Sequence, residues 1–369
     1  MKSTRVEKSI LGNQIGKAVY GSNGNMLLNK GVVVNNKVLA KLMNHNVNYI
    51  YIEDPLSDGI EPEGIIEEKQ MVGSISTVKK VFEDVMKQEK QGVRAVIPED
   101  HLKLVEEIIN SLMESLESAE DILYTVVDLI GTDEYTYKHS VNVAVLSILT
   151  AKALEYSYED IKSIALGAIL HDIGKVRVNI DLIKKPGKLT QEERKEVERH
   201  PQLGYELVQN VDSIPYSTKQ IIRLHHEKLD GSGYPLGLRG FEVPQYVRIV
   251  TICDMYDAMT TDRVYRSRMP IYKALDILMG EAVYKIDRNI YKFMTNNICI
   301  FPPGLGVVLS DGRLGVIASY KAQNPSRPQV RVLTHHTENR RVEVQVVNLE
   351  DNRSIFIEDT WDVEGFMIG

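Results

Sequence analysis

Histidine and aspartate are the residues whose placement first suggests chemistry. Five of the nine histidines among the 369 residues fall between positions 139 and 226. Asp172 directly follows one of them, and Asp254 interrupts the mostly apolar run of residues 249–258. Such side chains are costly in apolar surroundings unless they are paired or bind a metal. The candidate metal ligands are therefore His139, His171, Asp172, His200, His225, His226 and Asp254.

The ligand types indicate which metals could bind. Nitrogen and oxygen donors suit iron, manganese, cobalt or zinc. The two cysteines, Cys253 and Cys299, are not paired as a structural zinc site requires. A single histidine is more often a hydrogen-bonded structural residue than a ligand, but seven such residues are hard to explain by separate structural roles. Seven donors also exceed what one ion with an open position uses, so the set predicts two metals.

Most of these histidines are expected at helix ends. His171, with Gly174 as a helix stop, and the pair His225 and His226 would each close a helix. Because adjacent residues on a helix point about 100° apart, we expect the chain to unwind just after His226. Pro201 biases His200 away from helical geometry, so a break is expected there. The helices that carry these residues are predicted over about 136–153, 159–171, 218–226 and 244–259.

The fold is expected to be mainly α, with small β-containing modules at both ends. Residues 47–52 are rich in β-branched and aromatic residues, and Asp311-Gly312 between two apolar runs indicates a hairpin. Amphipathic stripes over 78–85 and 102–112 indicate packing helices and leave a homodimer open. The expected parts are an N-terminal β module, regulatory helices, a catalytic helical domain and a C-terminal β module, at residues 1–60, 61–115, 116–298 and 299–369.

Composition narrows the class of protein. Apolar residues make up 43% and charged residues 26%, which excludes a disordered chain. The net charge of −7 argues against a nucleic-acid polymer as partner. The purest apolar run, residues 164–170, is far shorter than the ~20 residues that span a bilayer. With few cysteines and no signal peptide at the N-terminus, we expect a cytoplasmic protein without membrane insertion.

Several motifs in order resemble the HD-GYP phosphodiesterases, which belong to the HD superfamily of metal-dependent phosphohydrolases. The resemblance covers about residues 135–268 and implies an HD-type helical bundle in a bacterial cytoplasm. It also implies hydrolysis of cyclic di-GMP to linear pGpG, with a hydroxide that bridges two metals as the nucleophile. The motifs are the segments His171–Lys175, Lys185–Leu189, His200–Pro201, His225–Glu227, Asp230–Pro235 and Asp254–Arg266.

The resemblance also implies a role for each site residue. The cofactors would be two divalent ions, with iron as the first expectation and manganese as the alternative. One ion would be held by His139, His171, Asp172 and Asp254, and the other by His200, His225 and His226, with Asp172 bridging. Asp172 and Lys175 are the expected catalytic residues. The residues assigned to substrate binding are Lys175, Arg263, Arg266 and Asp257, the last interpreted as lying behind the ligands one helical turn after Asp254.

One departure from the family pattern limits the metal count. Some relatives place a glutamate four residues before the first histidine and hold a third metal. Here that position is Tyr135, and Glu134 lies five residues before His139, on another helix face. We therefore expect two metals and accumulation of pGpG.

Two matters stay open at this point. Residues 231–235 can be a glycine-dependent turn that fixes the histidine pair, or a surface on which a protein partner docks. The whole chain can also be a cyclic di-GMP receptor that has lost catalysis, or an HD hydrolase of another cyclic dinucleotide, because the pocket walls rather than the metals select the base.

Overall fold

The computed structural model separates into two compact units, each described here by itself. Residues 69–120 and 134–298 form the helical unit, and residues 1–68 and 299–369, with Leu123, form the β-rich unit. The described residues are all except 22–24, 46, 54–56, 63, 93–94, 118–122, 124–134, 186, 262–267, 337–340 and 361–369, and the side chains at 135, 333–336 and 341–343 are also left undescribed. The expected mainly α fold with small β-containing modules is confirmed.

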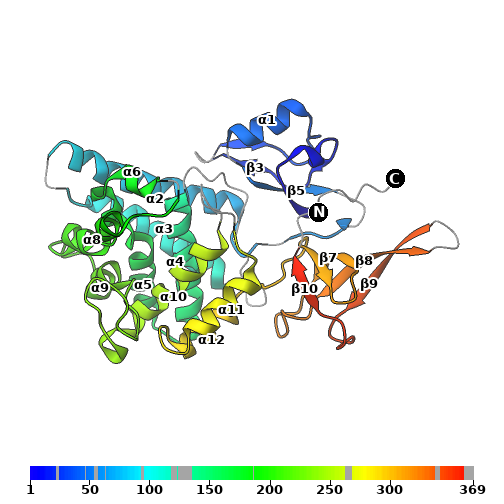
Figure 1. Cartoon of the computed structure of the whole chain (residues 1–369). Helices are drawn as coiled ribbons and strands as arrows, with labels where there is room; N and C mark the ends of the chain where they lie inside the picture. Colours follow the sequence, from blue (N-terminus) through cyan, green and yellow to red (C-terminus); the bar gives the residue numbers. More distant parts are fainter. Residues whose placement is uncertain are drawn as a thin grey trace. The chain divides into compact units, whose positions relative to one another are not determined.

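Helices make up the larger unit (Figure 1). Two long helices, α2 and α3, come first in the sequence of this unit, and α4 to α12 follow as a bundle. The 3₁₀ helices η4 and η5 lie between helices of that bundle along the chain. Their bounds are α2 Glu68–Lys90, α3 Glu99–Glu117, α4 Tyr135–Ala153, α5 Tyr158–Leu170, η4 Ile173–Arg177, α6 Ile180–Ile183, α7 Gln191–Val197, α8 His200–Val208, α9 Tyr216–Leu224, η5 Gly240–Glu242, α10 Gln245–Thr260, α11 Ile271–Glu281 and α12 Arg288–Thr295.

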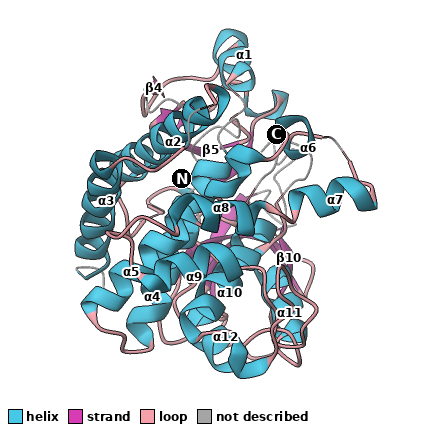
Figure 2. Cartoon of the chain, turned by 90° about the vertical axis from the view of Figure 1, so that its left-hand side faces the viewer, coloured by secondary structure: helices cyan, strands magenta, loops and turns pink. Residues whose placement is uncertain are grey.

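The core of the bundle is built around two helices, α4 and α10, that are buried on nearly every face. In α4, all residues from Lys138 to Ala151 are buried, and α10 is buried along most of its length. A helix without a polar face must be surrounded by other elements. Accordingly, α4 packs against α5 and α10, α5 packs against α9, and α9 packs against α8 (Figure 2). These contacts bring the ends of α5 and α9, the start of α8 and the interiors of α4 and α10 to one place inside the unit.

The structure corrects two local expectations in this bundle. His200 is the first residue of α8 rather than a non-helical residue, because Pro201 lacks only an N–H that the first turn leaves free in any case. The break falls before it, between Val197 and His200. In addition, α9 ends at Leu224, so both histidines of the pair follow the helix instead of closing it.

Gly174 is explained by close packing rather than by a helix stop, because it lies inside η4. A Cβ atom at this position would meet the carbonyl oxygen of His200 at 1.9 Å and the amide nitrogen of Gly204 at 2.4 Å. Only glycine therefore allows η4 to lie directly on α8.

The smaller unit joins the two ends of the chain. In its N-terminal part, strands β1, β5 and β2 form an antiparallel sheet in that order, β3 pairs with β4, and α1 covers an apolar core. Outside these strands, Val33 forms one isolated antiparallel bridge with Gln14. The bounds are β1 Lys2–Arg5, η1 Lys8–Ile10, β2 Gln14–Ile15, β3 Val19–Tyr20, β4 Met26–Leu28, α1 Asn36–Asn44 and β5 Tyr49–Glu53.

The C-terminal part is a five-stranded antiparallel sheet in the order β10-β6-β7-β8-β9. The predicted hairpin is confirmed, with Gly312 at φ +82° in its turn. The two parts touch each other, since Ser3 N–H donates to Gly304 O at 3.0 Å and Ile60 packs against Val316. The bounds are β6 Gly306–Leu309, β7 Leu314–Ser319, β8 Gln329–His336, β9 Arg341–Asn348 and β10 Ile357–Thr360.

The two amphipathic stripes lie in α2 and α3, as expected for packing helices. Their apolar residues in 78–85 and 102–112 are buried within the single chain. The stripes therefore leave no exposed apolar face in these two segments for a second copy. Among the described residues, no helix has both the length and the apolar character needed to cross a bilayer.

Candidate metal centre

Helix ends deliver most of the candidate ligands to one point. His171 and Asp172 follow the end of α5, His200 begins α8, and the pair His225 and His226 follows α9. The remaining two, His139 and Asp254, come from the interiors of α4 and α10, the two helices at the core of the bundle. The structure thus brings all seven candidates together, and all except His226 are buried.

Three overlapping groups of ligand atoms can be distinguished. In each group, the nitrogen and oxygen atoms lie within 4.8 Å of one another. His171 belongs to two groups and so does His225, which makes the cluster continuous. The groups are His139, His171 and Asp254; His171, Asp172 and His225; and His200, His225 and His226.

Two polar atoms at the middle of the cluster are left without a hydrogen bond. Nε2 of His171 and Oδ1 of Asp172 are buried, and neither has a hydrogen-bond partner among the described residues. Buried polar atoms almost always have a partner, so an orphaned nitrogen and oxygen side by side need an explanation. A cation that accepts their lone pairs provides one, and the donor set therefore fits divalent metal ions.

Backbone carbonyls fix the orientation of three of the imidazole rings. Nδ1 of His171 donates to Ala168 O at 2.7 Å, Nδ1 of His200 donates to Val197 O at 2.8 Å, and Nδ1 of His225 donates to a carbonyl of α9. A carbonyl can only accept, so the proton must lie on Nδ1 in each ring. Nε2 then carries the free lone pair that a metal needs.

A carboxylate performs the same task for His139. Its Nδ1 donates to Asp257 Oδ2 at 2.7 Å, and its Nε2 lies 3.0 Å from Asp254 Oδ1. Asp257 is fully buried, and its other oxygen accepts hydrogen bonds from Asn142 at 2.8 Å and Thr261 at 2.9 Å. The structure therefore places Asp257 behind His139 and not at a surface that a substrate could reach.

The surroundings set the charges of these groups. Burial lowers the pKa of His200 to about 3 and that of His226 to about 4, and it also lowers the pKa of His225. Burial opposes the charged form of His139 as well, but the hydrogen bonds to Asp254 and to the carboxylate behind it raise its pKa to about 9. Three rings are thus held neutral, which is the form that ligates a metal.

The carboxylates keep their negative charge. Burial alone would raise the pKa of Asp172, but the charge of the Lys175 ammonium group outweighs it and holds the pKa well below the usual value. The pKa of Asp254 is lowered in the same way, against burial, chiefly by its hydrogen bond with His139. Two charged carboxylates among neutral imidazoles form a strong site for divalent cations.

A family model described as "HD domain" matches residues 103–290 and so contains every one of these candidate ligands. That match spans half of the chain. The chain belongs to the HD-domain family. A second model, described as "KOW domain associated with HD domain", matches residues 306–366, which include all five strands of the C-terminal sheet. The resemblance to HD-GYP phosphodiesterases expected from the motifs is thereby confirmed at the level of the family.

Curated relatives of this HD-domain protein act on cyclic dinucleotides, according to their names. A cyclic di-GMP phosphodiesterase of Pseudomonas aeruginosa is 33% identical over 243 residues, which are 66% of this chain and 58% of that protein. The 3′3′-cGAMP-specific phosphodiesterase 3 of Vibrio cholerae is 37% identical over 169 residues, 46% of this chain and 36% of that one. A cyclic di-GMP phosphodiesterase response regulator of Xanthomonas campestris is 39% identical over 134 residues, 36% and 35% of the two chains. The HD-domain protein thus spans less than two thirds of each of these relatives.

Of the three basic residues expected to contact phosphate, only Lys175 lies within the described part of the chain. Lys175 lies at the rim of the HD-domain cluster, where its ammonium group donates to Asp172 and its side chain is 26% exposed. Arg263 and Arg266 lie outside the described residues. Glu134 is also outside them, and of Tyr135 only the backbone is described, so the expected limit of two metals stays a prediction.

Sequence reasoning missed the residues that support the ligands. Asn142 lies three residues after His139, and Thr261 lies four after Asp257, so helical spacing alone could have suggested both. The sequence indicates for Tyr234 only a place in a turn or in a docking surface for a partner, yet its ring lies 4.7 Å from that of His226, measured between centroids. Nothing in the spacing of a loop residue could have predicted that contact.

Proposed function

We propose that this chain is a metal-dependent phosphodiesterase that hydrolyses cyclic di-GMP to linear pGpG. The observation that carries the proposal is the convergence of seven imidazole and carboxylate side chains around two buried atoms that lack a hydrogen bond. The printed names of the relatives from Pseudomonas and Xanthomonas support the choice of substrate. In the reaction, water adds to phosphorus, and the bond between phosphorus and the 3′-oxygen breaks.

The proposed cofactors are two divalent ions, with iron favoured and manganese as the alternative. When bound, such ions supply a nucleophile at neutral pH and neutralise charge on the phosphoryl oxygens. His171 and Asp172 belong to the group at the centre of the cluster, so Asp172 is the proposed bridge. The proposed ligands are His139, His171, Asp172 and Asp254 for one ion, and His200, His225 and His226 for the other.

The chain's own residues would then bind and orient the phosphate. Lys175 is partly exposed beside Asp172, so its ammonium group can turn from that carboxylate toward a phosphate oxygen. We expect Arg263 and Arg266 to bind the phosphates from the segment that follows α10. A cationic rim of this kind attracts a dianionic substrate even though the whole chain is negatively charged.

A second substrate deserves a direct comparison. The 37% identity to a 3′3′-cGAMP-specific enzyme favours hydrolysis of that dinucleotide as the alternative. The ligand cluster determines phosphodiester hydrolysis, whereas the base is selected by other residues of the pocket. A receptor that binds a cyclic dinucleotide without cleaving it is the third case.

One experiment separates these cases. Protein loaded anaerobically with Fe²⁺ or Mn²⁺ is incubated with cyclic di-GMP and with 3′3′-cGAMP, and the products are separated by liquid chromatography. We expect pGpG from cyclic di-GMP, and none from the Asp172→Ala variant. Tight binding without turnover would support the receptor, cleavage of 3′3′-cGAMP alone would change the substrate, and full activity of Asp172→Ala would refute the metal-dependent reaction.

The proposal includes a cytoplasmic setting in a bacterium. Two further proposals are a homodimer and a separate protein partner that binds at residues 231–235. Analytical ultracentrifugation tests both. A loop that ends beside the ligand cluster is well placed for such a partner to influence turnover.

A further inference from the structure

His226 differs from the other four histidines of the cluster. Each of the others donates a hydrogen bond from Nδ1 to a carbonyl or carboxylate oxygen. The ring of His226 makes no hydrogen bond to any described residue, and its Nδ1 lies 3.6 Å from Asp254. Its side chain is also 27% exposed, whereas those of His139, His171 and His200 are at most 3% exposed. Something other than a hydrogen bond must therefore hold this ring.

The ring of Tyr234 takes that place. The two ring centroids lie 4.7 Å apart with an angle of 34° between the planes, so the rings pack against each other in a tilted arrangement. The same tyrosine presents its edge to the ring of His200 at 6.4 Å. Tyr234 therefore touches two of the three histidines in one ligand group.

The loop is shaped so that this tyrosine can reach the ring. A Cβ atom on Gly233 would meet the carbonyl oxygen of His226 at 2.5 Å and the amide nitrogen of Lys228 at 2.4 Å, so only glycine fits. The next amide, that of Tyr234, donates to the same carbonyl at 3.3 Å. The chain thus folds back directly on the residue whose ring it covers.

A buried carboxylate holds the loop in this position. Glu227 is 1% exposed, and its oxygens accept hydrogen bonds from the amides of Leu236 at 2.6 Å, Gly237 at 3.2 Å and Leu238 at 2.9 Å. A buried charge is tolerated only when it is satisfied in this way. The residue directly after His226 therefore ties down the far side of Tyr234.

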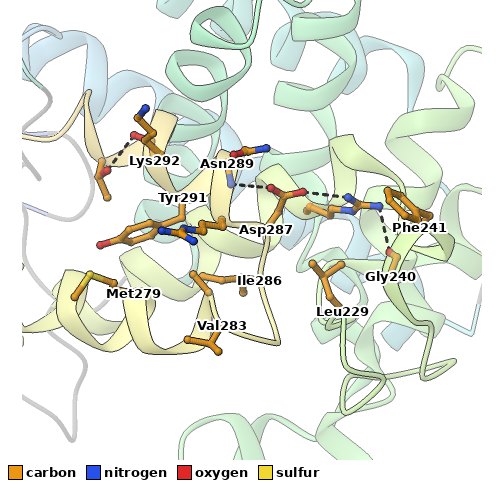
Figure 3. A pocket seen from close by; sticks show the side chains of 14 residues that line it. Leu229, Gly240, Phe241, Met279, Val283, Ile286, Asp287, Asn289, Tyr291 and Lys292 are labelled. Carbon is orange, nitrogen blue, oxygen red and sulfur yellow. Dashed lines mark hydrogen bonds and ion pairs between the residues drawn. The ribbon is translucent and has the colours of Figure 1, made fainter.

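The outer end of the loop is fixed as well. The guanidinium of Arg248 donates to the carboxylate of Asp287 at 3.0 Å and to the carbonyl oxygen of Gly240 at 3.1 Å. Figure 3 marks interactions at the labelled Asp287 and Gly240 with dashed lines. The amide of Gly240 in turn donates to Leu229 O, and the Leu229 amide donates to Lys285 O. A loop clamped at both ends forms a rigid support.

We propose that Tyr234 is a positioning residue that fixes the ring of His226 for metal binding, and that Glu227 contributes by holding the loop that carries Tyr234. The inference rests on the proposed function, because it assumes that the group of His200, His225 and His226 holds an ion. The inference gives Tyr234 a role that needs no protein partner.

Four variants test the inference with Mn²⁺ as the probe. Tyr234→Leu keeps apolar bulk but removes the ring, Tyr234→Phe keeps the ring, and Glu227→Gln weakens the anchor of the loop. Tyr216→Leu is the matched control, because Tyr216 is 72% exposed on α9, the helix that His225 follows. The readouts are Mn²⁺ stoichiometry and affinity by isothermal titration calorimetry, and the melting temperature of the metal-free protein.

We expect Tyr234→Leu and Glu227→Gln to weaken one of the two Mn²⁺ sites by about 10- to 100-fold. Tyr234→Phe and Tyr216→Leu should bind as the wild type does, and the metal-free melting temperature of Tyr234→Leu should stay close to the wild-type value. Unchanged Mn²⁺ binding in Tyr234→Leu, or in Glu227→Gln if the first variant does not fold, overturns the inference and leaves the proposed function intact. A wild-type protein that binds no Mn²⁺, Fe²⁺ or other divalent ion overturns the proposed function itself.

Discussion

Replacing Asp257 by asparagine would test how a buried carboxylate prepares His139 to bind metal. One oxygen of Asp257 accepts the Nδ1 proton of the imidazole at 2.7 Å. The other accepts from the amide of Asn142 and the hydroxyl of Thr261. Asparagine has almost the same shape but carries one donor group in place of an acceptor.

The direction of the effect follows from these partners. The oxygen of the new amide should stay on the side of Asn142 and Thr261, where two donors require it, so its NH₂ group would face the imidazole. Nδ1 of His139 must then accept, and the ring proton moves to Nε2, the atom that should ligate the metal. Loss of such a supporting group costs about 10- to 100-fold in metal affinity, or about 1.4–2.8 kcal/mol. The pKa of His139, raised to about 9 in part by Asp257, should also fall.

The assay uses protein stripped of metal with a chelator. Mn²⁺ affinity is measured by isothermal titration calorimetry, and the titration of His139 is followed by NMR. Asp212→Asn is the matched control, because Asp212 is exposed and lies at the far end of α9 from the ligand pair. The reasoning is refuted if Asp257→Asn binds Mn²⁺ as tightly as the control and leaves the pKa of His139 unchanged.

Three other outcomes can be predicted. Gly174→Ala should lower the free energy of unfolding by about 1–3 kcal/mol, because the added Cβ clashes with His200 O. Gly280→Ala, with open space around the new Cβ, should raise the free energy of unfolding by about 0.5–1 kcal/mol. Urea denaturation measures both changes. Metal-free protein should be most stable near pH 6.5. Below that pH the unfolded chain binds more protons, because the folded-state pKa of His200 is about 3, and above it the folded chain binds more, because the pKa of His139 is about 9. A free energy of unfolding that rises steadily from pH 6.5 to 9 would contradict this. Metal analysis should find two ions per chain and pGpG should accumulate, since Tyr135 stands where a further ligand would be needed; three tightly bound ions would show this to be wrong.

Local patterns predicted the helices well. The apolar runs around His139 and His171 and the stripes of α2 and α3 have a helical period that needs no long-range information, and the helices begin and end within a few residues of the expected positions. The candidate ligands were found because their residue types are costly to bury singly. The cost of burying a side chain depends on its chemistry and can be judged before any contact is known.

Contacts between distant segments could not be predicted in this way. The clash that explains Gly174 comes from α8, 26 residues further along the chain at His200. The pairing of Ser3 with Gly304 joins segments about 300 residues apart. Hydrophobic periodicity says which face of an element is buried but not which other element buries it. The role of Pro201 was misjudged for a related reason, because the rule for the residue before proline does not say whether a new helix begins there.

The position of the ligands at helix ends has a physical cause. The last carbonyls of a helix have no intrahelical partner, so a histidine placed just beyond the end can donate Nδ1 to the carbonyl three residues earlier. His171 does so after α5, His225 does so after α9, and His200 does so after α7. Each ring thereby acquires the tautomer with a free Nε2 from the backbone alone. His139 lies inside a helix, where no such carbonyl is free, and it needs a carboxylate from α10 instead. His226 follows α9 by one residue more than His225 and makes no such hydrogen bond to a described residue, and its ring packs against the ring of Tyr234 instead. The histidines that lack a helix-end carbonyl are therefore the two whose supporting residues should be most sensitive to mutation.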